Sequence, residues 1–352
     1  MIPLCRPMID EATIERATSV LRSGRLVQGP EVEAFERALA ERTGRRHAIC
    51  VSNGTSALEL AFRALGLEPG SEILVPSLTW PSPAHAARAL GLEVRLVDVD
   101  AEEWNARASH FREKRTPRTK AAVVIDQFGF PVRQVELREA LDGLVVIEDA
   151  ACALGSRGEL VPGGGFGHVS CLSFHPRKIV TTGEGGACLT DDDALAAELR
   201  ALRNHGQAAP GVFTVAAGNH RLTDFAAAMG RAQLDRLDEE IERRRAIADA
   251  LRRALPSLAF QREAPGTAAN VQTLGALLPA GLGRDEAIAA LRARGVEAGR
   301  LSYALSRLPT VAVDQPAPNA EAIEDRGVAL PMFGALTDHE VERIVLSVES
   351  LR

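Results

Sequence analysis

The sequence lacks the long apolar segments of membrane and secreted proteins. None of its apolar runs approaches the roughly 20 residues that a transmembrane helix needs. Residues 1–17 also lack the basic flank and following apolar run that mark a signal peptide. We therefore expect a cytoplasmic protein with no membrane partner.

Paired cysteines are also lacking. The five cysteines form no CxxC pair and no metal-ligand spacing. An odd, scattered set is typical of reduced thiols in the cytosol, and we expect no metal site. Cys50, Cys171 and Cys188 stand within apolar runs, so we expect them to be buried as small hydrophobic side chains.

The chain has no excess of positive charge. Its net charge is −6 and its lysines and arginines are spread along the sequence, so it has no general attraction for nucleic acid. A hydrophobic content of 46% and a charged content of 25% are those of a globular protein. A length of 352 residues suits a large domain with a smaller one. We expect these at residues 1–238 and 239–352, the second beginning with a connecting helix.

Short apolar runs alternate with helical patterns from residue 48 to about residue 189. Several runs are nearly continuous in Val, Ile and Leu, as in strands that are covered on both faces. The alternation predicts an α/β fold with a mostly parallel seven-stranded sheet flanked by helices. The expected strands are 47–51, 72–75, 93–98, 121–126, 144–148, 169–174 and 186–189, and the expected helices between them include 57–65, 83–90 and 132–141.

The pattern changes after residue 191. Residues 194–204 and the long charged stretch 224–255 are expected to be helices, the second leaving the large domain. A smaller α/β unit follows, with a strand near 272–278 and helices at 284–294 and 338–351. Thr337 is the expected N-cap of the last helix.

Ligands in open α/β sheets bind beyond the carboxyl ends of the strands, so the residues that follow each strand are the candidate site. Ser-Asn-Gly-Thr-Ser at residues 52–56 follows the first strand. A glycine and hydroxyl residues at a helix start expose free N–H groups and the positive end of the helix dipole, which suit a phosphate. An ordinary N-cap with a turn glycine explains this sequence equally well.

Two further loops suit a flat, charged ring. Trp80 follows the second strand, and an aromatic side chain there could stack on a ring, although ordinary packing also explains it. Glu148 and Asp149 end an apolar strand, and only one of them can face a given side of the sheet. A carboxylate at this depth needs a cationic partner, either a protonated heterocyclic nitrogen or an arginine of the protein.

The fourth loop presents Lys178. The sequence Ser-Phe-His-Pro-Arg-Lys at 173–178 is followed by Thr-Thr-Gly-Glu-Gly-Gly at 181–186. A lysine in a rigid, glycine-flanked turn suits imine formation, which needs a positioned amine, while a solvated surface lysine is the ordinary alternative. Together the four loops supply what pyridoxal phosphate (PLP) requires: a phosphate site, a stacking ring, an acid and an imine-forming lysine.

These motifs resemble those of the DegT/DnrJ/StrS sugar-nucleotide aminotransferases, within the fold-type-I PLP enzymes. The resemblance runs nearly from end to end of the chain. Its most specific parts are VIEDAA at 146–151 and SFHPRK with TTGEGG at 173–186. Other matching segments are SGRLVQGPEVEAFERALAERTG, NGTSAL, VPSLTW, TPRTKAAVVIDQFG, RNHG, GNHRLTDFAAAMGRAQLDRL and LPMFGALTDHEVERI.

The resemblance implies roles for individual residues. Lys178 would form the Schiff base with PLP and move the proton, with pyridoxamine phosphate as the intermediate form of the cofactor. Asp149 would keep the pyridine nitrogen protonated. Trp80 would stack on the ring.

The resemblance also implies the phosphate ligands and a shared active site. Gly54, Thr55, Ser56 and Ser173 would bind the phosphate of the cofactor. Asn219 matches an asparagine that reaches the phosphate from the neighbouring subunit. We therefore expect a homodimer whose active sites are built by both subunits.

Two segments depart from the pattern of the family. Cys152 stands where many members have Gln or His close to the 3-oxygen of the cofactor, and a thiol is a weaker hydrogen-bond partner. The histidine-containing segment that helps form the substrate mouth is replaced by VEAGRLSYAL at 296–305. This second departure bears on the identity of the acceptor.

We therefore predict an aminotransferase that moves the amino group of L-glutamate to a keto-sugar, nucleotide-linked, in amino-sugar, secondary-metabolite or polysaccharide biosynthesis. One alternative is a PLP enzyme of the same fold that acts on a non-sugar ketone or catalyses elimination. Another is a non-catalytic regulator or partner subunit, which would not need a lysine imine. Of the remaining candidates, His175 and His205 are expected to be structural, and Glu184 is not assigned a role.

Overall fold

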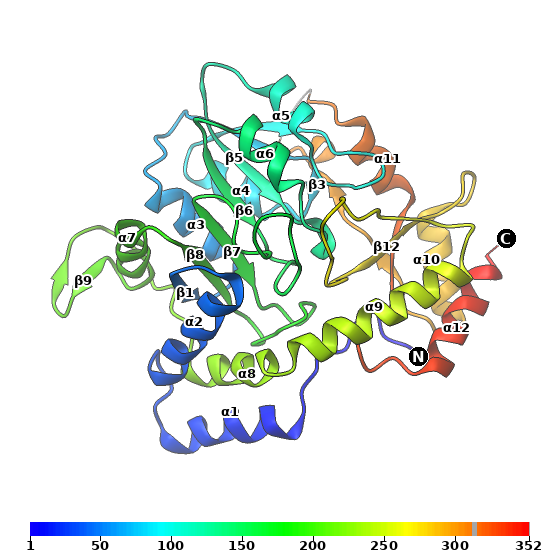
Figure 1. Ribbon diagram of the computed structural model, residues 1–352, viewed down its shortest axis with the longest axis horizontal. Coiled ribbons are helices and arrows are strands. Elements are labelled where there is room, and N and C mark those ends of the chain that lie inside the picture. The colour runs from blue at the N-terminus through cyan, green and yellow to red at the C-terminus, as the bar shows by residue number, and fades with distance from the viewer. Residues whose placement is uncertain (312–314, 352) are drawn as a thin grey trace.

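A computed structural model describes residues 1–311 and 315–351 of the chain. Its centre is a seven-stranded sheet, as the sequence predicts (Figure 1). The strands, from one edge of the sheet to the other, are β1 (His47–Val51), β8 (Gly186–Thr190), β7 (Val169–Ser173), β6 (Val145–Asp149), β5 (Thr119–Ile125), β2 (Glu72–Pro76) and β4 (Glu93–Val97). All seven lie within two residues of the predicted ranges.

The sheet is parallel except at one strand. β8 runs antiparallel to both of its neighbours, β1 and β7, while the other pairs are parallel. The carboxyl ends of β1, β2, β5, β6 and β7 therefore meet at one edge of the sheet. Since both faces are covered, the strands consist almost wholly of buried residues.

Helices cover both faces of the sheet, and alternate strand residues face each layer. In β1, Ile49 and Val51 pack in the core under α3 (Gly54–Ala64), α4 (Ser82–Ala89) and α7 (Asp193–Arg203). Ala48 and Cys50 of the same strand face α2 (Pro30–Thr43) and α8 (Asp224–Leu234). The helices α5 (Ala108–Lys114) and α6 (Gln134–Ala140) extend this second layer, and α1 (Glu11–Ser23) lies beside α8.

The predicted helix 224–255 is wrong in one respect, because the structure has two helices there. α8 ends at Leu234, and α9 (Leu237–Ala254) begins after Arg236, whose φ of −117° and ψ of 10° are not helical. The first turn of α9 carries three acidic residues, which favour a helix start through the dipole. Gly230 lies inside α8, and residues 231–255 contain no proline or glycine, so this break has no local signal in the sequence.

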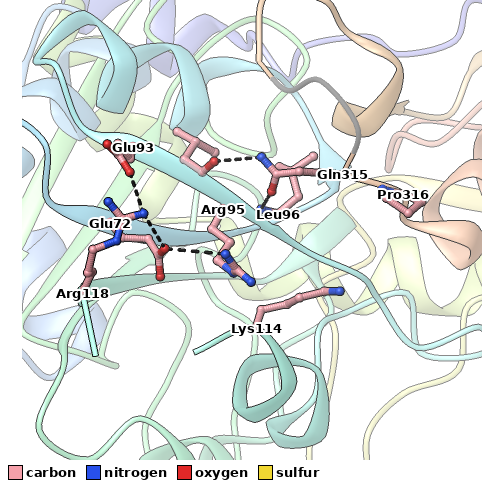
Figure 2. A pocket seen from close by; sticks show the side chains of 9 residues that line it. Glu72, Glu93, Arg95, Leu96, Lys114, Arg118, Gln315 and Pro316 are labelled. Carbon is pink, nitrogen blue, oxygen red and sulfur yellow. Dashed lines mark hydrogen bonds and ion pairs between the residues drawn. The ribbon is translucent and has the colours of Figure 1, made fainter. Parts of the chain in front are cut away.

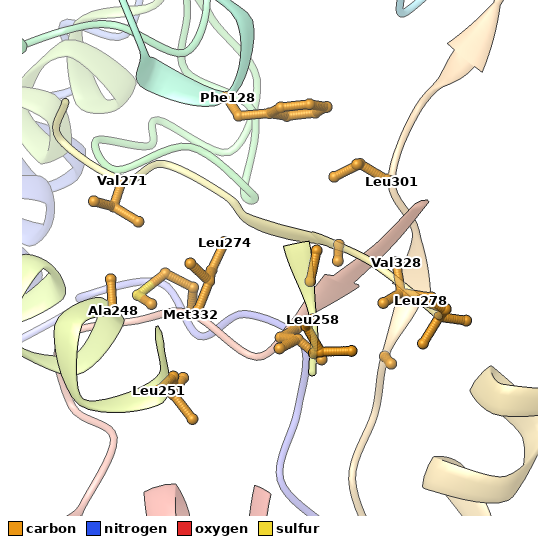
Figure 3. Close-up of a cluster of buried hydrophobic side chains, with 14 of the residues drawn as sticks. Phe128, Ala248, Leu251, Leu258, Val271, Leu274, Leu278, Leu301, Val328 and Met332 are labelled. Atoms are coloured by element: carbon orange, nitrogen blue, oxygen red, sulfur yellow. The ribbon is translucent and has the colours of Figure 1, made fainter. Parts of the chain in front are cut away.

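The C-terminal part forms a second, four-stranded sheet in the order β11 (Ala259–Phe260), β12 (Leu274–Leu277), β15 (Gly327–Leu330) and β13 (Gly299–Arg300). It packs with α9 around a core that includes Leu251, Leu274 and Met332 (Figure 3). Three helices complete this part: α10 (Arg284–Ala293), α11 (Pro318–Arg326) and α12 (Asp338–Glu349). Thr337 caps α12 as predicted, since its hydroxyl accepts a hydrogen bond from the Glu340 N–H.

Two small pairs of strands lie outside these sheets. The hairpin of β9 (Gln207–Ala209) and β10 (Val212–Phe213) projects from the large sheet (Figure 1). The pair β3 (Leu78–Thr79) and β14 (Tyr303–Ala304) joins the loop after β2 to the C-terminal part. Within residues 1–311 and 315–351, no helix has the length and apolar character that crossing a membrane requires.

The three cysteines predicted to be core residues are buried thiols. Cys50, Cys171 and Cys188 are at most 1% exposed. Burial raises the pKa of the Cys50 thiol well above its ordinary value. These cysteines therefore act as small core side chains.

Candidate active site

The predicted site residues meet at the carboxyl edge of the large sheet. β1 ends at Val51, β6 ends at Asp149 and β7 ends at Ser173. Because β8 is antiparallel, it begins at this same edge with Gly186, which pairs with both Val51 and Ser173. The segments 52–56, 149–152 and 173–186 therefore lie next to one another.

A candidate phosphate site lies at the start of α3. Asn53 caps this helix, and its side-chain oxygen accepts a hydrogen bond from Ser56 N at 2.8 Å. The helix begins at Gly54, three residues before the predicted start, so the first N–H groups after the cap lie at the site. A Cβ added to Gly54 would stand 2.8 Å from the Cβ of Ser173. Gly54 and Ser173 are thus in close approach, and only glycine fits at position 54.

The hydroxyl groups of this loop differ in their exposure and in their hydrogen bonds. The Thr55 hydroxyl is exposed and shares a hydrogen bond with Ser82 at 2.9 Å. The Ser56 hydroxyl is buried and lies 3.2 Å from that of Ser52 and 3.3 Å from the His220 ring. Thr55 is therefore free to turn to a ligand, whereas Ser56 offers mainly its backbone.

Lys178 stands in a tight turn after β7. Its N–H donates to the carbonyl of His175 at 2.8 Å, and its amine lies 3.1 Å from the Cys152 sulfur. The His175 ring accepts a hydrogen bond from Arg177 N, and its partial burial lowers its pKa. His175 therefore shapes the turn as a neutral ring, whereas Lys178 presents its amine to the sheet edge.

The two adjacent acids of β6 have different environments. Glu148 is fully buried and accepts hydrogen bonds from the N–H groups of Gly164 and Phe166, so it anchors the loop between β6 and β7. Asp149 points to the other face and accepts one from Ala151 N at 3.1 Å. None of the ion pairs among the described residues includes Asp149. The arginine partner considered from the sequence is thus not found there.

The electrostatics of Asp149 favour a cationic ligand. Burial raises the pKa of its carboxyl, while the Ala151 N–H and the positive charge of Lys178 lower the pKa. A protonated ring nitrogen would stabilise the ionised carboxylate in the same way that an ion pair does. The donor set at this edge therefore fits PLP: a helix start for the phosphate, an amine for the aldehyde and an acid for the ring nitrogen.

Trp80 lies at the mouth of the site. Its side chain is 64% exposed, although the residues before it in the loop are buried. The ring of Tyr303 meets it edge-on, with the centroids 5.6 Å apart, and the Arg300 guanidinium lies over the Tyr303 ring. One face of Trp80 is thus free for stacking on a flat ligand.

Sequence reasoning did not assign a role to Tyr303. It belongs to the departing segment 296–305, and β14 brings it opposite Thr79, next to Trp80. Tyr303 is the only tyrosine of the chain, and that rarity was the one signal available in the sequence.

Among the described residues, Asn219 makes no hydrogen bond with the other predicted site residues. It is exposed, and its side-chain oxygen accepts a hydrogen bond from Arg221 N at 3.3 Å. Its neighbour His220 holds Ser52 N through its carbonyl at 2.8 Å. Asn219 therefore faces outward beside the loop that begins the phosphate site.

A cavity of about 380 Å³ lies away from this site, beside the amino ends of β2 and β4 (Figure 2). Four of its charged side chains pair with one another. Arg118 contacts Glu93 at 3.0 Å, and Arg95 lies 3.7 Å from Glu72. It shares no lining residue with the carboxyl edge, where the predicted chemistry is located.

Comparison with known proteins shows the family to which the chain belongs. The model of the DegT/DnrJ/EryC1/StrS aminotransferase family matches residues 7–349. The GDP-perosamine synthase of Caulobacter vibrioides is 33% identical over 338 residues, which cover 92% of this chain and 90% of that protein.

Solved structures give the same result. The aminotransferase TlmJ from Streptoalloteichus hindustanus superposes with a TM-score of 0.94 at 31% identity, covering 100% of this chain and 98% of the other. S. venezuelae DesV has a TM-score of 0.94 at 30% identity with the same coverage. The chain therefore belongs to the DegT/DnrJ/EryC1/StrS aminotransferase family and is a PLP-dependent aminotransferase.

Proposed function

We propose that this enzyme moves the amino group of L-glutamate to a nucleotide-linked keto-sugar. The observation that carries the reaction is the placement of Lys178 and the buried Asp149 at one sheet edge. The similarity over nine-tenths of both chains to a protein named GDP-perosamine synthase supports an amino-sugar product. An enzyme with this role belongs to amino-sugar, secondary-metabolite or polysaccharide biosynthesis.

We assign the cofactor contacts as follows. The N–H groups at Gly54 and Thr55 and the hydroxyl of Ser173 hold the phosphate, with the backbone of Ser56 as a further donor. Trp80 covers one face of the ring, and Asp149 holds the ring nitrogen in its protonated form. These contacts require no movement of the strands, because all of these residues lie at the same edge.

PLP supplies an aldehyde that binds amines and a ring that takes up electrons when a bond at the α-carbon breaks. Lys178 would hold the cofactor covalently through its amine, and this amine would become free to act as a base when the amino group of glutamate takes its place. The free amine of Lys178 would take up the proton from the α-carbon of the donor and return it to the cofactor carbon that carried the aldehyde. The complete exchange would convert glutamate to 2-oxoglutarate and the keto-sugar to an amino-sugar, with Lys178 moving the proton in both halves.

In this scheme, Cys152 sets how strongly the Lys178 amine is held by a hydrogen bond. Its thiol lies 3.1 Å from the amine, where the resemblance places Gln or His in many members. A thiol is a weak acceptor, so it restrains the amine less than an amide oxygen does. We expect Cys152 to affect the rate of the proton transfer and not the identity of the products.

We also propose a homodimer in which Asn219 completes the phosphate site of the partner subunit. The hairpin β9–β10 carries exposed Val212 and Phe213 at its tip, an apolar surface that suits a subunit contact. The outward position of Asn219 suits the same arrangement. The division into domains at residue 238 and a cytoplasmic location are likewise proposals.

The test is a product assay with purified enzyme, L-glutamate and a panel of nucleotide-linked keto-sugars. We expect stoichiometric 2-oxoglutarate and an amino-sugar nucleotide, seen by mass spectrometry, and neither product with Lys178→Ala. A transfer to non-sugar ketones alone would contradict the proposed acceptor. Release of ammonia without an aminated product would contradict transfer itself and favour elimination.

A further inference from the structure

We propose that Gln272 is a positioning residue for Lys178, an inference that rests on the role proposed above for this lysine. The Gln272 side chain joins the peptide groups on both sides of Lys178. Ile179 N donates to its Oε1 at 2.7 Å, and its Nε2 donates to the carbonyl of Arg177. Gln272 is 5% exposed, so both bonds are shielded from water.

This clamp comes from a distant part of the chain. Gln272 lies 93 residues beyond Ile179, just before β12 of the C-terminal sheet. Inside the turn, Lys178 is held by its own N–H bond to His175. The C-terminal part therefore fixes the position of the Lys178 backbone, and with it the point from which the side chain extends.

The segment 270–272 also holds the loop of Cys152, whose thiol contacts the Lys178 amine. The Asn270 side chain donates to the carbonyls of Cys152 and Leu154, both at 2.9 Å, and its oxygen accepts a hydrogen bond from Gln272 N at 2.8 Å. The segment thus links the Cys152 loop to the Lys178 turn, and the thiol and the amine that meet at 3.1 Å belong to these two loops. A single short segment sets the distance between them.

The backbone of this segment is strained. Val271 has a φ of 51° although it is β-branched, and it is fully buried. Such a conformation persists only where its surroundings determine it, and it is found preferentially at functional sites. Arg244 of α9 supplies part of that restraint, because its guanidinium donates to the Gln272 carbonyl at 3.3 Å while pairing with Glu240.

The chemistry requires a carboxamide at position 272. The clamp needs an acceptor for the Ile179 N–H and a donor for the Arg177 carbonyl, and only Asn and Gln carry both as an amide. Glu would place a carboxylate oxygen against that carbonyl. Met would keep the length of the side chain and lose both bonds.

The structure offers a matched control at Gln233. This glutamine is also buried, accepts a hydrogen bond from Thr181 N at 3.0 Å and donates to the Thr181 carbonyl at 2.6 Å. It fixes the same loop by the same pair of bonds, three residues beyond Lys178. Loss of either clamp should destabilise the fold to a similar extent, but only the clamp at Gln272 acts on Lys178.

The test compares Gln272→Met with Gln233→Met in the holoenzyme. We expect the two variants to lower Tm to a similar extent. The rate at which L-glutamate removes the visible band in a single turnover should fall only in Gln272→Met. We expect a fall of about 10- to 100-fold, as for a catalytic group misplaced by about 1 Å. The pH midpoint of that band should also shift only in Gln272→Met. Equal rates and an unchanged midpoint would overturn the proposal.

A second measurement does not depend on the cofactor. In the wild-type apoprotein, amide hydrogen exchange at Ile179 should be slow, although it follows three exposed or half-exposed residues, and Gln272→Met, which removes the acceptor of this N–H, should make it fast. Rapid exchange in the wild-type protein would overturn the clamp. If the wild-type holoenzyme forms no visible band, the function proposed for Lys178 fails, and the exchange result still decides on Gln272.

Discussion

The close approach of Gly54 and Ser173 can be tested with Gly54→Ala. The added Cβ would stand 2.8 Å from the Ser173 Cβ and 3.2 Å from its Oγ. Carbon atoms in contact prefer about 3.5–4.0 Å, so the two loops must separate by roughly 1 Å. The φ of Gly54 lies outside the left-handed region, which leaves this contact as the direct cost of the substitution.

The separation should weaken the binding of the cofactor phosphate. Gly54 N and the Ser173 hydroxyl are both assigned to the phosphate, and a hydrogen bond to a charged group contributes about 1.5–3 kcal/mol. Loss of one such bond raises the dissociation constant of PLP by about 10- to 100-fold, since about 1.4 kcal/mol corresponds to a factor of ten. The apoprotein should keep its fold, because Ala is favoured over Gly in a helix by about 1 kcal/mol.

The assay is a titration of apoprotein with PLP, followed by the visible band of the lysine-bound cofactor. Ser173→Gly removes the atoms that the new methyl group meets, so the double variant should bind PLP no worse than Ser173→Gly alone. A Gly54→Ala variant with wild-type affinity would refute the reasoning. So would strictly additive losses in the double variant.

Three further outcomes are expected. Asp149→Asn should keep the cofactor bound but slow its reaction with L-glutamate by about 100- to 1,000-fold. This is the usual effect of removing one group that stabilises charge in a transition state. A wild-type rate in this variant would contradict the role of Asp149. Burial and the nearby Glu148 raise the pKa of Asp126 well above its ordinary value of 3.8. The stability that Asp126 contributes is therefore present at low pH and is lost as the pH rises. Asp126→Asn should raise Tm at neutral pH, and this gain in Tm should shrink as the pH falls toward 3.8. A gain in Tm that grows on acidification would contradict this. PLP should quench the fluorescence of exposed Trp80 more than that of buried Trp104, so Trp80→Phe should abolish most of the quenching, and unchanged quenching would show that the ring lies elsewhere.

The large sheet could be predicted from the sequence because its strands are continuous apolar runs between helical patterns. β1 has the predicted bounds, and β4 and β7 end one residue earlier than predicted. The break between α8 and α9 could not be predicted, because residues 235 and 236 are Asp and Arg and no glycine or proline stands there. Such a break is set by tertiary packing, here the burial of Leu237 and Ile241 against residues of α2 and the large sheet.

Some residues of the site could be predicted from the sequence, and others could not. The order of the motifs along the chain placed Gly54, Asp149 and Lys178 at one edge, which the structure has. Which of the two adjacent acids faces the site depended on the loop at 164–166, which engages Glu148. Gln272 carries no local signal, since an isolated glutamine is most often a solvated side chain and its partners lie 93 and 95 residues away.

Lys178 is proposed to hold PLP and to move the proton while the amino group of L-glutamate is transferred. The most direct measurement is the visible absorbance spectrum of the purified protein before and after addition of L-glutamate, beside Lys178→Ala. We expect a yellow band in the wild-type protein that falls as one equivalent of 2-oxoglutarate appears, and no such lysine-bound band in the variant. No band in the wild-type protein with added PLP, or a stable band that L-glutamate leaves unchanged, would contradict the account.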